Sequence, residues 1–440
     1  MRRSQETEWQ FKGGITAFLS LLFVLILSLV GALLESASIQ MTRSLKRADV
    51  NLALESAFAE YHPDMLHIYD LFVRFGGDEE TLRNRLEYYG AGNMSHQLMK
   101  RELLTDYEGA VYYNQAIRYM KDLLGLEHNP GESEEISKEI SYEEAEEDIL
   151  EELTPLLEEE EVGLQGGNNP LDLAGRQKSM GLLALLIGKD NPLSEHKVAI
   201  ETLPSHRTLQ QGDYPKQDMG GTTETLLFTT YLTEHFSDYT KSKDTKALLY
   251  EQEYLLQGRE SDRENLERVC RKLVNLRLAV NYTYLLTDAG RQAEAEAMAL
   301  TLCSLVLNPE ITPLVKQAVL LAWAYAESIV DVRALLRNKK VPAIKTTDTW
   351  QIQLANVSKL GTGEEISGEK NFETGLTYGD YLKSLLLLEK KGTLCMRSLD
   401  LIEANLHIKT DQCVTRVQIK TKVKLRRGVE DEFLTTFVYE

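Results

Sequence analysis

One uncharged apolar stretch constrains this chain more than any other feature. Residues 15–34 read ITAFLSLLFVLILSLVGALL and include no charged side chain. At about 1.5 Å per helical residue, such a run matches the ~30 Å hydrocarbon core of a bilayer. A lone segment in lipid satisfies its backbone only as a helix. We therefore expect a single transmembrane helix over residues 15–35 that carries one large body, because no comparable run follows.

A cleaved signal peptide is the alternative interpretation of this stretch. Its apolar core would span only about 7–15 residues before a small-residue cleavage site. Ser36-Ala37-Ser38 has the composition of such a site, but the longer core favours a retained anchor. Basic residues flank the helix almost equally on both sides, so the positive-inside rule barely decides its orientation. The short tail, residues 1–14, favours a cytoplasmic N-terminus and an extracellular body on the cell membrane.

Small and polar residues form one stripe of the expected transmembrane helix. They recur at steps of three and four and comprise Ala17, Ser20, Ser28, Gly31, Glu35 and Ser38. Small residues let membrane helices approach closely, which predicts a packing face for a partner helix, with Glu35 in a polar contact across it. In the other interpretation Glu35 lies in water at the interface and the serines are incidental.

The negative charge of the chain is concentrated in one tract. Between Glu132 and Glu161 there are fifteen acidic residues and one basic residue, Lys138, so this segment supplies −14 of the formal net charge of −19. Like-charge runs of this density are typically solvated, and we expect residues 127–170 to be an acidic mobile linker. A chain this acidic is a poor general binder of nucleic acid.

Hydrophobic periodicity predicts an α+β fold outside the membrane. A long stalk helix should continue the membrane helix, stop before Pro63 and lead into a first helical part, residues 36–126. Residues 171–340 should form a mainly helical body, with a capping box at Ser261–Glu264 and Pro313 opening a central helix. Residues 341–440 should be α+β. Strand patterns occur at residues 248–256, 349–355, 417–425 and 433–439, and the last two predict a C-terminal hairpin in a small antiparallel sheet.

The first strand of this hairpin carries a row of basic residues on one face. It comprises Arg416, Lys420, Lys422, Lys424 and Arg426. Three interpretations remain open. The row is a solvated face that protects an edge strand, a docking surface for an acidic partner or an acidic cell-wall polymer, or a set of internal ion pairs, for example with Glu251 and Glu253.

Chemistry-bearing motifs do not emerge from the sequence. The eight histidines are scattered, the four cysteines show no CxxC or zinc-like spacing, and no nucleophile elbow, phosphate loop or HExxH occurs. We therefore expect no catalytic, metal or cofactor-binding residues and no small-molecule substrate. Cys270 and Cys303 should be buried thiols. Whether Cys395 and Cys413 form a disulfide is left open.

Three blocks of the chain resemble known membrane proteins. The opening Gly13-Gly14-Ile15-Thr16-Ala17-Phe18-Leu19-Ser20-Leu21, with Leu33-Leu34-Glu35-Ser36-Ala37, resembles pseudopilin-like proteins of tight-adherence (Tad) pilus loci. A central block, residues 250–258 with Ser261-Asp262 and Asn265-Leu266, and a late block, residues 378–382 and 400–405, are similar to a family of unknown function in Gram-positive, clostridia-like bacteria. One feature departs from type IV pilins: with Gly14 as the cleavage glycine, Leu19 stands where they carry glutamate.

The resemblance implies a location and companions but no reaction. It favours a surface-exposed, minor-pilin-like structural or assembly component of a Tad-type pilus or secretion apparatus. Its partners would be other membrane proteins of that apparatus. The alternative is a membrane-anchored cell-envelope enzyme or ligand-binding ectodomain whose site forms only in space.

Overall fold

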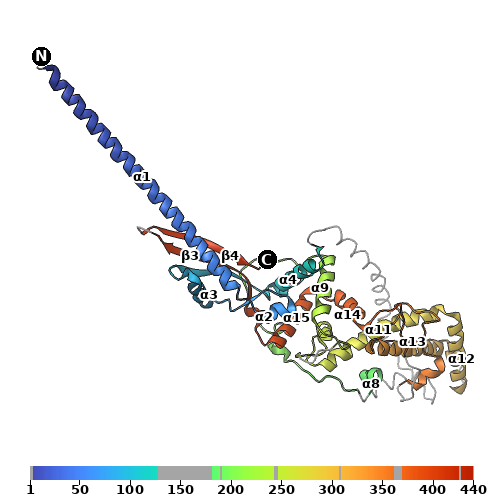
Figure 1. Cartoon of the computed structure of the whole chain (residues 1–440). Helices are drawn as coiled ribbons and strands as arrows, with labels where there is room; N and C mark the ends of the chain where they lie inside the picture. The colour runs from blue at the N-terminus through green and yellow to red at the C-terminus, as the bar shows by residue number, and fades with distance from the viewer. Residues whose placement is uncertain are drawn as a thin grey trace.

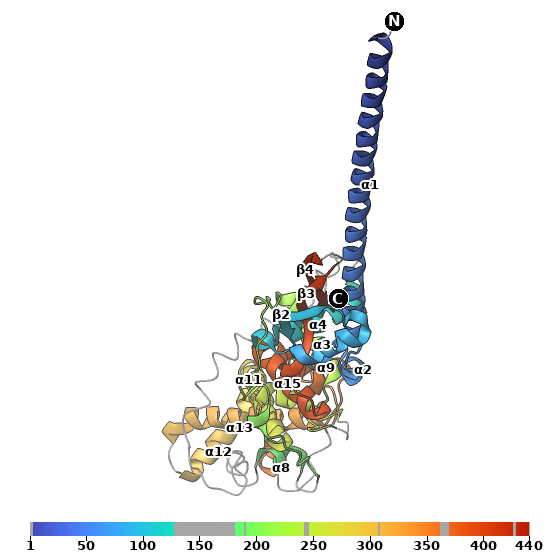
Figure 2. The same ribbon diagram turned by 90° about the vertical axis from the view of Figure 1, so that its left-hand side faces the viewer.

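One long helix projects from a body of helices and a small sheet (Figure 1). The structure, a computed structural model, describes residues 3–126, 181–188, 191–241, 246–306, 309–360, 369–425 and 428–439. The predicted acidic linker, residues 127–170, lies outside them. The C-terminus lies beside the point where the long helix meets the body (Figure 2). The predicted α+β class is confirmed.

Helix α1 (Arg3–Phe58) is 56 residues long and has no break. At 1.5 Å per residue it extends about 84 Å. The predicted stop before Pro63 is confirmed, because α2 (Pro63–Tyr69) begins there. Pro63 stands in the first turn, where its missing N–H leaves no hydrogen bond unmade. The His62 side chain caps the new helix by accepting from the Met65 backbone N–H, at 3.3 Å.

A four-stranded antiparallel sheet holds the lower half of α1. It consists of β1 (Arg74–Phe75), β2 (Ser95–Leu103), β3 (Cys413–Lys424) and β4 (Glu430–Val438). Strand β3 is central: it pairs with β2 on one side and with β1 and β4 on the other. The predicted C-terminal hairpin is therefore confirmed. The sheet also joins the two ends of the chain, since β1 and β2 precede β3 by more than three hundred residues.

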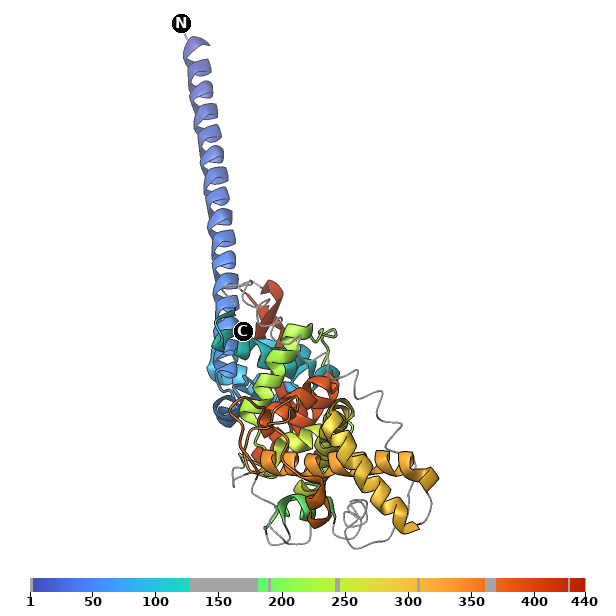
Figure 3. The same cartoon turned by 90° about the vertical axis from the view of Figure 1, so that its right-hand side faces the viewer.

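The rest of the body is helical. Helix α12 lies at the end of the body that is farthest from α1 (Figures 1 and 3). Within the described residues the α-helices after α2 are α3 (Glu79–Leu86), α4 (Asp106–Leu123), α8 (Leu182–Ile187), α9 (Thr222–His235), α10 (Glu251–Gln257), α11 (Asp262–Thr287), α12 (Ala289–Val306), α13 (Thr312–Leu336), α14 (Tyr378–Leu388) and α15 (Lys391–Leu406). Short 3-10 and π turns lie at Glu87–Ala91, Ile200–Thr202, Pro309–Ile311, Leu354–Lys359 and Thr410–Gln412.

Two hydrophobic clusters organise these elements. The smaller one lies between α1, α3 and the sheet and includes Leu54, Phe58 and Ile419. The larger one fills the helical body around Trp323, which is fully buried on α13. All four cysteines are buried and free, so the thiol prediction holds and no Cys395–Cys413 disulfide forms.

Two strand predictions were wrong. The alternating segment at residues 248–256 contains helix α10, and its acidic positions are buried along with its apolar ones, so the alternation does not separate two faces. The segment at residues 349–355 is an extended chain followed by a 3-10 turn. Its backbone is satisfied by side chains instead of a neighbouring strand: Ile352 N donates to Glu327 Oε2 at 2.9 Å, and the Trp323 indole donates to Ile352 O at 2.9 Å.

Candidate functional site

The upper part of α1 exposes an apolar surface on all sides. No residue of its most apolar 18-residue window is buried in the body, and Phe18, Leu21 and Leu34 are each about two-thirds exposed. A side-chain shell of this kind is stable in hydrocarbon and costly in water. Helix α1 is long and apolar enough to cross a membrane, which fits a single-pass anchor.

The predicted packing face lies on this part of α1. Ala17, Ser20, Ser28 and Gly31 are exposed, whereas Glu35 and Ser38 are half-buried. A Cβ on Gly31 would meet no atom within 4 Å, so the helix surface there is flat and accessible. The Ser20 hydroxyl donates to Ala17 O at 2.9 Å, which satisfies it within its own helix. The small-residue face therefore offers close backbone approach more than hydrogen bonding.

The lower part of α1 is fixed to the sheet by apolar packing. One face of the helix is buried there, comprising Val50, Ala53, Leu54, Ala57 and Phe58. The Phe58 ring stacks on Phe437 of β4 with centroids 4.4 Å apart. The Tyr439 hydroxyl donates to the Phe58 carbonyl at 2.5 Å. Aromatic pairs of this kind add to the area that they bury, so the end of the chain closes onto the end of α1.

A charged contact fixes the hairpin higher on α1. Asp431 at the start of β4 is 3.5 Å from Arg43 Nε and 3.6 Å from Arg47 Nη2. The Arg47 guanidinium also lies 5.2 Å from the centre of the Phe433 ring. The Asp431 side chain is mostly buried, which strengthens these attractions relative to open water. Contacts therefore join helix and sheet from Arg43 to Phe58.

The structure places the basic row of β3 opposite acidic residues of β4. Lys420 pairs with Glu432, Lys422 lies 3.6 Å from the same carboxylate, and Lys424 lies 3.7 Å from Glu430. The antiparallel register causes this, since Lys422 faces Glu432 and Lys424 faces Glu430.

The remaining members of the row differ from these lysines. The Arg416 guanidinium lies 4.2 Å from the centre of the Tyr214 ring, and Arg426 lies outside the described residues. Glu251 and Glu253, the sequence-based example of internal partners, are buried in the helical body instead. Docking by this row stays a prediction, and cross-strand pairing already neutralises part of its charge.

The central and late sequence blocks meet inside the helical body. Three side-chain hydrogen bonds join them: Tyr378 to Glu253 at 2.7 Å, Tyr254 to Asp400 at 2.8 Å and Asn405 to Glu251 at 2.8 Å. Each of the three acidic residues in these bonds is fully buried. Buried polar groups that are partnered fix a unique arrangement of the elements that carry them. These bonds tie α10 to α14 and α15.

Glu251, Glu253 and Asp400 form a buried hub. Its carboxylates, and that of Asp262, accept further hydrogen bonds from within the chain. Glu251 accepts from the Ser237 backbone and hydroxyl, both at 2.8 Å, and pairs with Lys246. Asp262 accepts from the backbone N–H groups of Leu249 and Tyr250 at 2.9 and 3.1 Å. Asp262 thereby holds the turn into α10 in place. These acids therefore stabilise the fold.

Glu253 is the exception, because only one of its two carboxylate oxygens accepts hydrogen bonds. Its Oε1 accepts from the Tyr239 backbone N–H at 3.0 Å and from Tyr378, but its Oε2 is buried without a hydrogen-bond partner. Burial raises the pKa of Glu253 to about 8, although the Tyr378 hydroxyl opposes that rise. The side chain is therefore largely protonated at neutral pH.

A second buried charged cluster joins α11 to α13. Arg277 donates to Asp331 Oδ2 at 3.0 and 3.1 Å, while Lys345 donates to Asp331 Oδ1 at 2.7 Å and to Glu327 Oε1 at 2.6 Å. Burial opposes ionisation of Asp331, but the charges of Arg277 and Lys345 outweigh it and lower its pKa. Burial raises the pKa of Glu327 in spite of Lys345. Two positive and two negative groups balance in this site.

Sequence reasoning missed this cluster, although a signal was present. Glu327 and Asp331 stand four residues apart on one face of a helix that is otherwise nearly apolar. Because buried charges need partners, two acids at that spacing predict cations on neighbouring elements. Their identity could not be predicted, since Arg277 and Lys345 come from separate parts of the sequence.

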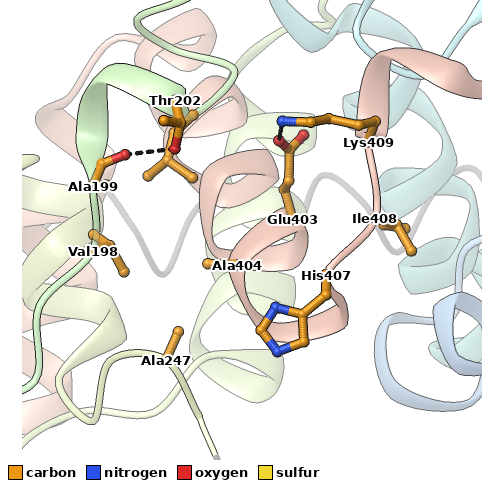
Figure 4. Close-up of a pocket in the computed structure, with 10 residues that line it drawn as sticks. Val198, Ala199, Thr202, Ala247, Glu403, Ala404, His407, Ile408 and Lys409 are labelled. Atoms are coloured by element: carbon orange, nitrogen blue, oxygen red, sulfur yellow. Dashed lines mark hydrogen bonds and ion pairs between the residues drawn. The ribbon is translucent and has the colours of Figure 1, made fainter.

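One shallow pocket lies beside the C-terminal end of α15 (Figure 4). It has a volume of about 360 Å³ and is lined by Val198, Ala199, Thr202, Leu203, Ala247, Glu403, Ala404, His407, Ile408 and Lys409. Its only carboxylate, that of Glu403, is bound by Arg207 and Lys409, both at 2.8 Å. Within the described residues no group of three or more His, Cys, Asp or Glu side chains could hold a metal ion.

Comparison with known proteins places the helical body in a family. A model described as a family of unknown function, DUF5702, matches residues 160–425. The match includes the central and late blocks that form the buried hub, and it begins well after α1. Neither a curated protein nor a solved structure matches the chain.

Proposed function

We propose that this chain, which belongs to the DUF5702 family of unknown function, is a membrane-anchored structural component of a Tad-type pilus or secretion apparatus. In this role it is minor-pilin-like and helps the apparatus to assemble. One observation carries the proposal. A single unbroken helix is exposed and apolar in its upper part and locked to the sheet in its lower part.

This division of α1 suits a protein that positions a body at a membrane. A flexible tether would leave the body free to tumble, whereas a continuous helix fixes its height and direction. The contacts from Arg43 to Phe58 extend that rigidity into the sheet. A rigid anchor is useful where the body must meet neighbouring subunits in a set geometry.

The buried charges of the body also support a structural role. The hub acids and the Arg277 cluster bind donors from other elements of the same chain. Their perturbed pKa values therefore have a structural cause, which weakens the usual inference from perturbed groups to catalysis. The carboxylate of the shallow pocket is bound in the same way.

The pilus part of the proposal rests on the opening sequence. Residues 13–21 and 33–37 resemble the start of pseudopilin-like proteins of Tad loci. Leu19 in place of the pilin glutamate argues against ordinary prepilin processing, so we propose that the anchor is retained. We also propose that the N-terminus is cytoplasmic and that the body lies outside the cell.

Co-purification tests this function. The full chain is tagged at its C-terminus, crosslinked in native membranes and recovered, and bound proteins are identified by mass spectrometry. We expect small pilins and other membrane proteins of the apparatus. Gly31→Leu should lower their recovery about tenfold, because a loss of 1.4 kcal/mol in helix packing has that effect.

Two further variants sharpen this test. Glu35→Ala should lower recovery in the same way if this residue makes a polar contact across the helix pair, whereas Leu27→Ile, a lipid-facing control, should not. Equal recovery from all variants at equal membrane abundance would remove the packing face from the proposal. Recovery of no pilus protein by the unmodified chain would refute the function itself.

A further inference from the structure

Helix α1 exposes a second apolar face beyond the membrane. Met41, Leu45 and Leu52 are 66%, 54% and 63% exposed, and Ala48 between them is also exposed. Leu52 lies eighteen residues past the end of the apolar run at Leu34, about 27 Å farther along the helix. It therefore stands well outside the hydrocarbon, in water. A row of large apolar side chains in water marks an interaction surface.

These residues share one side of the helix. Their spacing of four, three and four residues keeps them within a narrow stripe of an α-helix. Leu54, by contrast, lies about 160° around the helix from Leu52 and is buried against the sheet. The stripe thus points away from the sheet, and its residues are exposed. The body lies to one side of α1 (Figures 2 and 3).

The occupant that fits this stripe best is a second copy of the same chain. The same alternation of three and four residues continues upward through Ser38 and Leu34 into the apolar run. Copies anchored in one membrane are parallel and at the same depth, so identical residues of two helices meet level with one another. A sustained spacing of this kind is the pattern of a parallel, left-handed helix pair.

The geometry is compatible with such a pair. Beside the stripe, Asp49 pairs with Lys46 of the same helix at 3.1 Å, and Glu55, three residues past Leu52, marks the lower end of the stripe. Because the sheet packs on the opposite side of α1, the two bodies would point away from each other. Confinement to the membrane raises the effective concentration of the partner, so a short stripe suffices.

We propose that α1 forms a parallel, two-fold symmetric contact with a second copy of this chain along Met41, Leu45, Ala48 and Leu52. The inference goes beyond the proposed function, because it needs the membrane anchor but no pilus partner. It also assigns a role to the lower half of α1 that differs from fixing the sheet.

Cysteine crosslinking in membranes tests this contact with the full chain. The native cysteines are all buried, so an introduced surface thiol reacts alone. Leu52→Cys and Met41→Cys are compared with Asn51→Cys and Gln40→Cys, which are exposed at nearly the same depth but lie off the stripe. We expect a disulfide-linked dimer from the two stripe variants, at several times the yield of the two controls.

Other outcomes overturn the proposal. Equal yields from stripe and control positions would indicate random collision. No dimer, or a crosslinked product that contains a different protein, would show that something else covers the stripe. A second measurement is independent of thiols: Leu52→Glu should shift single-molecule photobleaching counts from two copies to one while the melting temperature stays unchanged. Two-copy counts that persist in this variant would also refute the contact, and co-purification of pilus proteins would report separately on the proposed function.

Discussion

Replacing Lys345 by methionine should strongly destabilise the helical body. The ammonium group is fully buried, 2.6 Å from Glu327 and 2.7 Å from Asp331. Without it, Arg277 balances only one of two buried carboxylates. Removal of one partner from a buried ion pair typically costs about 3–5 kcal/mol, which is a large share of the 5–15 kcal/mol that holds an ordinary domain together.

The loss should depend on pH in a definite direction. Burial already raises the pKa of Glu327 above the usual 4.5, and removal of Lys345 takes away the main opposing charge. A carboxyl whose folded-state pKa is raised contributes stability that is fully present below its unfolded pKa and is lost as pH rises through the folded pKa. The variant should therefore approach the stability of the unmodified protein near pH 4.5 and fall behind it as the pH rises.

Urea unfolding of the full chain in micelles measures this effect. Trp323 and Trp350 report on it by fluorescence, since their rings lie 5.8 Å apart beside the cluster. Lys409→Met is the matched control: it removes a half-exposed bridge to Glu403 and should cost less than about 1 kcal/mol. Equal losses from both variants, or a loss from Lys345→Met that does not change with pH, would refute the balanced-charge account.

Three further substitutions probe the packing. Phe58→Ala should cost about 3–5 kcal/mol, because it removes a buried ring stacked on β4, and urea unfolding followed by circular dichroism would measure it. Glu253→Gln should flatten the fall in stability between about pH 4.5 and about pH 8, because burial raises the folded-state pKa of Glu253 across that window and glutamine has no proton to lose; unfolding curves across that range would show it. Gly109→Ala should lower the melting temperature, because Gly109 has φ +81° and a new Cβ would lie 2.8 Å from Cys395 Cβ. A Gly109→Ala variant that melts with the unmodified protein would contradict that geometry.

Local patterns predicted the long helix α1, the starts of α11 and α13, and the hairpin. The capping serine at Ser261 indeed accepts from the Glu264 backbone N–H, at 3.3 Å, and α11 begins at the next residue. The alternation from Val417 to Leu425 is a strand with buried odd positions. Signals of this kind depend only on residues within one segment, so the sequence alone predicts the local structure that they form.

Contacts between distant segments could not be predicted from the sequence. Strand β2 pairs along most of β3, yet Ser95–Leu103 has no clean alternation, because its pairing with β3 includes two register shifts. The α10 segment was misread as a strand because its glutamates are buried by partners such as Tyr378 and Lys246 that only the fold supplies. The acidic partners of the basic row could not be predicted for the same reason, since Glu430 and Glu432 lie opposite it only through the hairpin register.

The intact mass of the protein recovered from washed membranes tests the central claim most directly. Membranes are stripped with alkaline carbonate to remove attached proteins, and the remaining chain is extracted and weighed by mass spectrometry. The account predicts the full chain of 49.9 kDa in the stripped membranes, because the exposed apolar part of α1 holds it there. A shortened chain that begins near Ile39 and appears in the soluble fraction would contradict it.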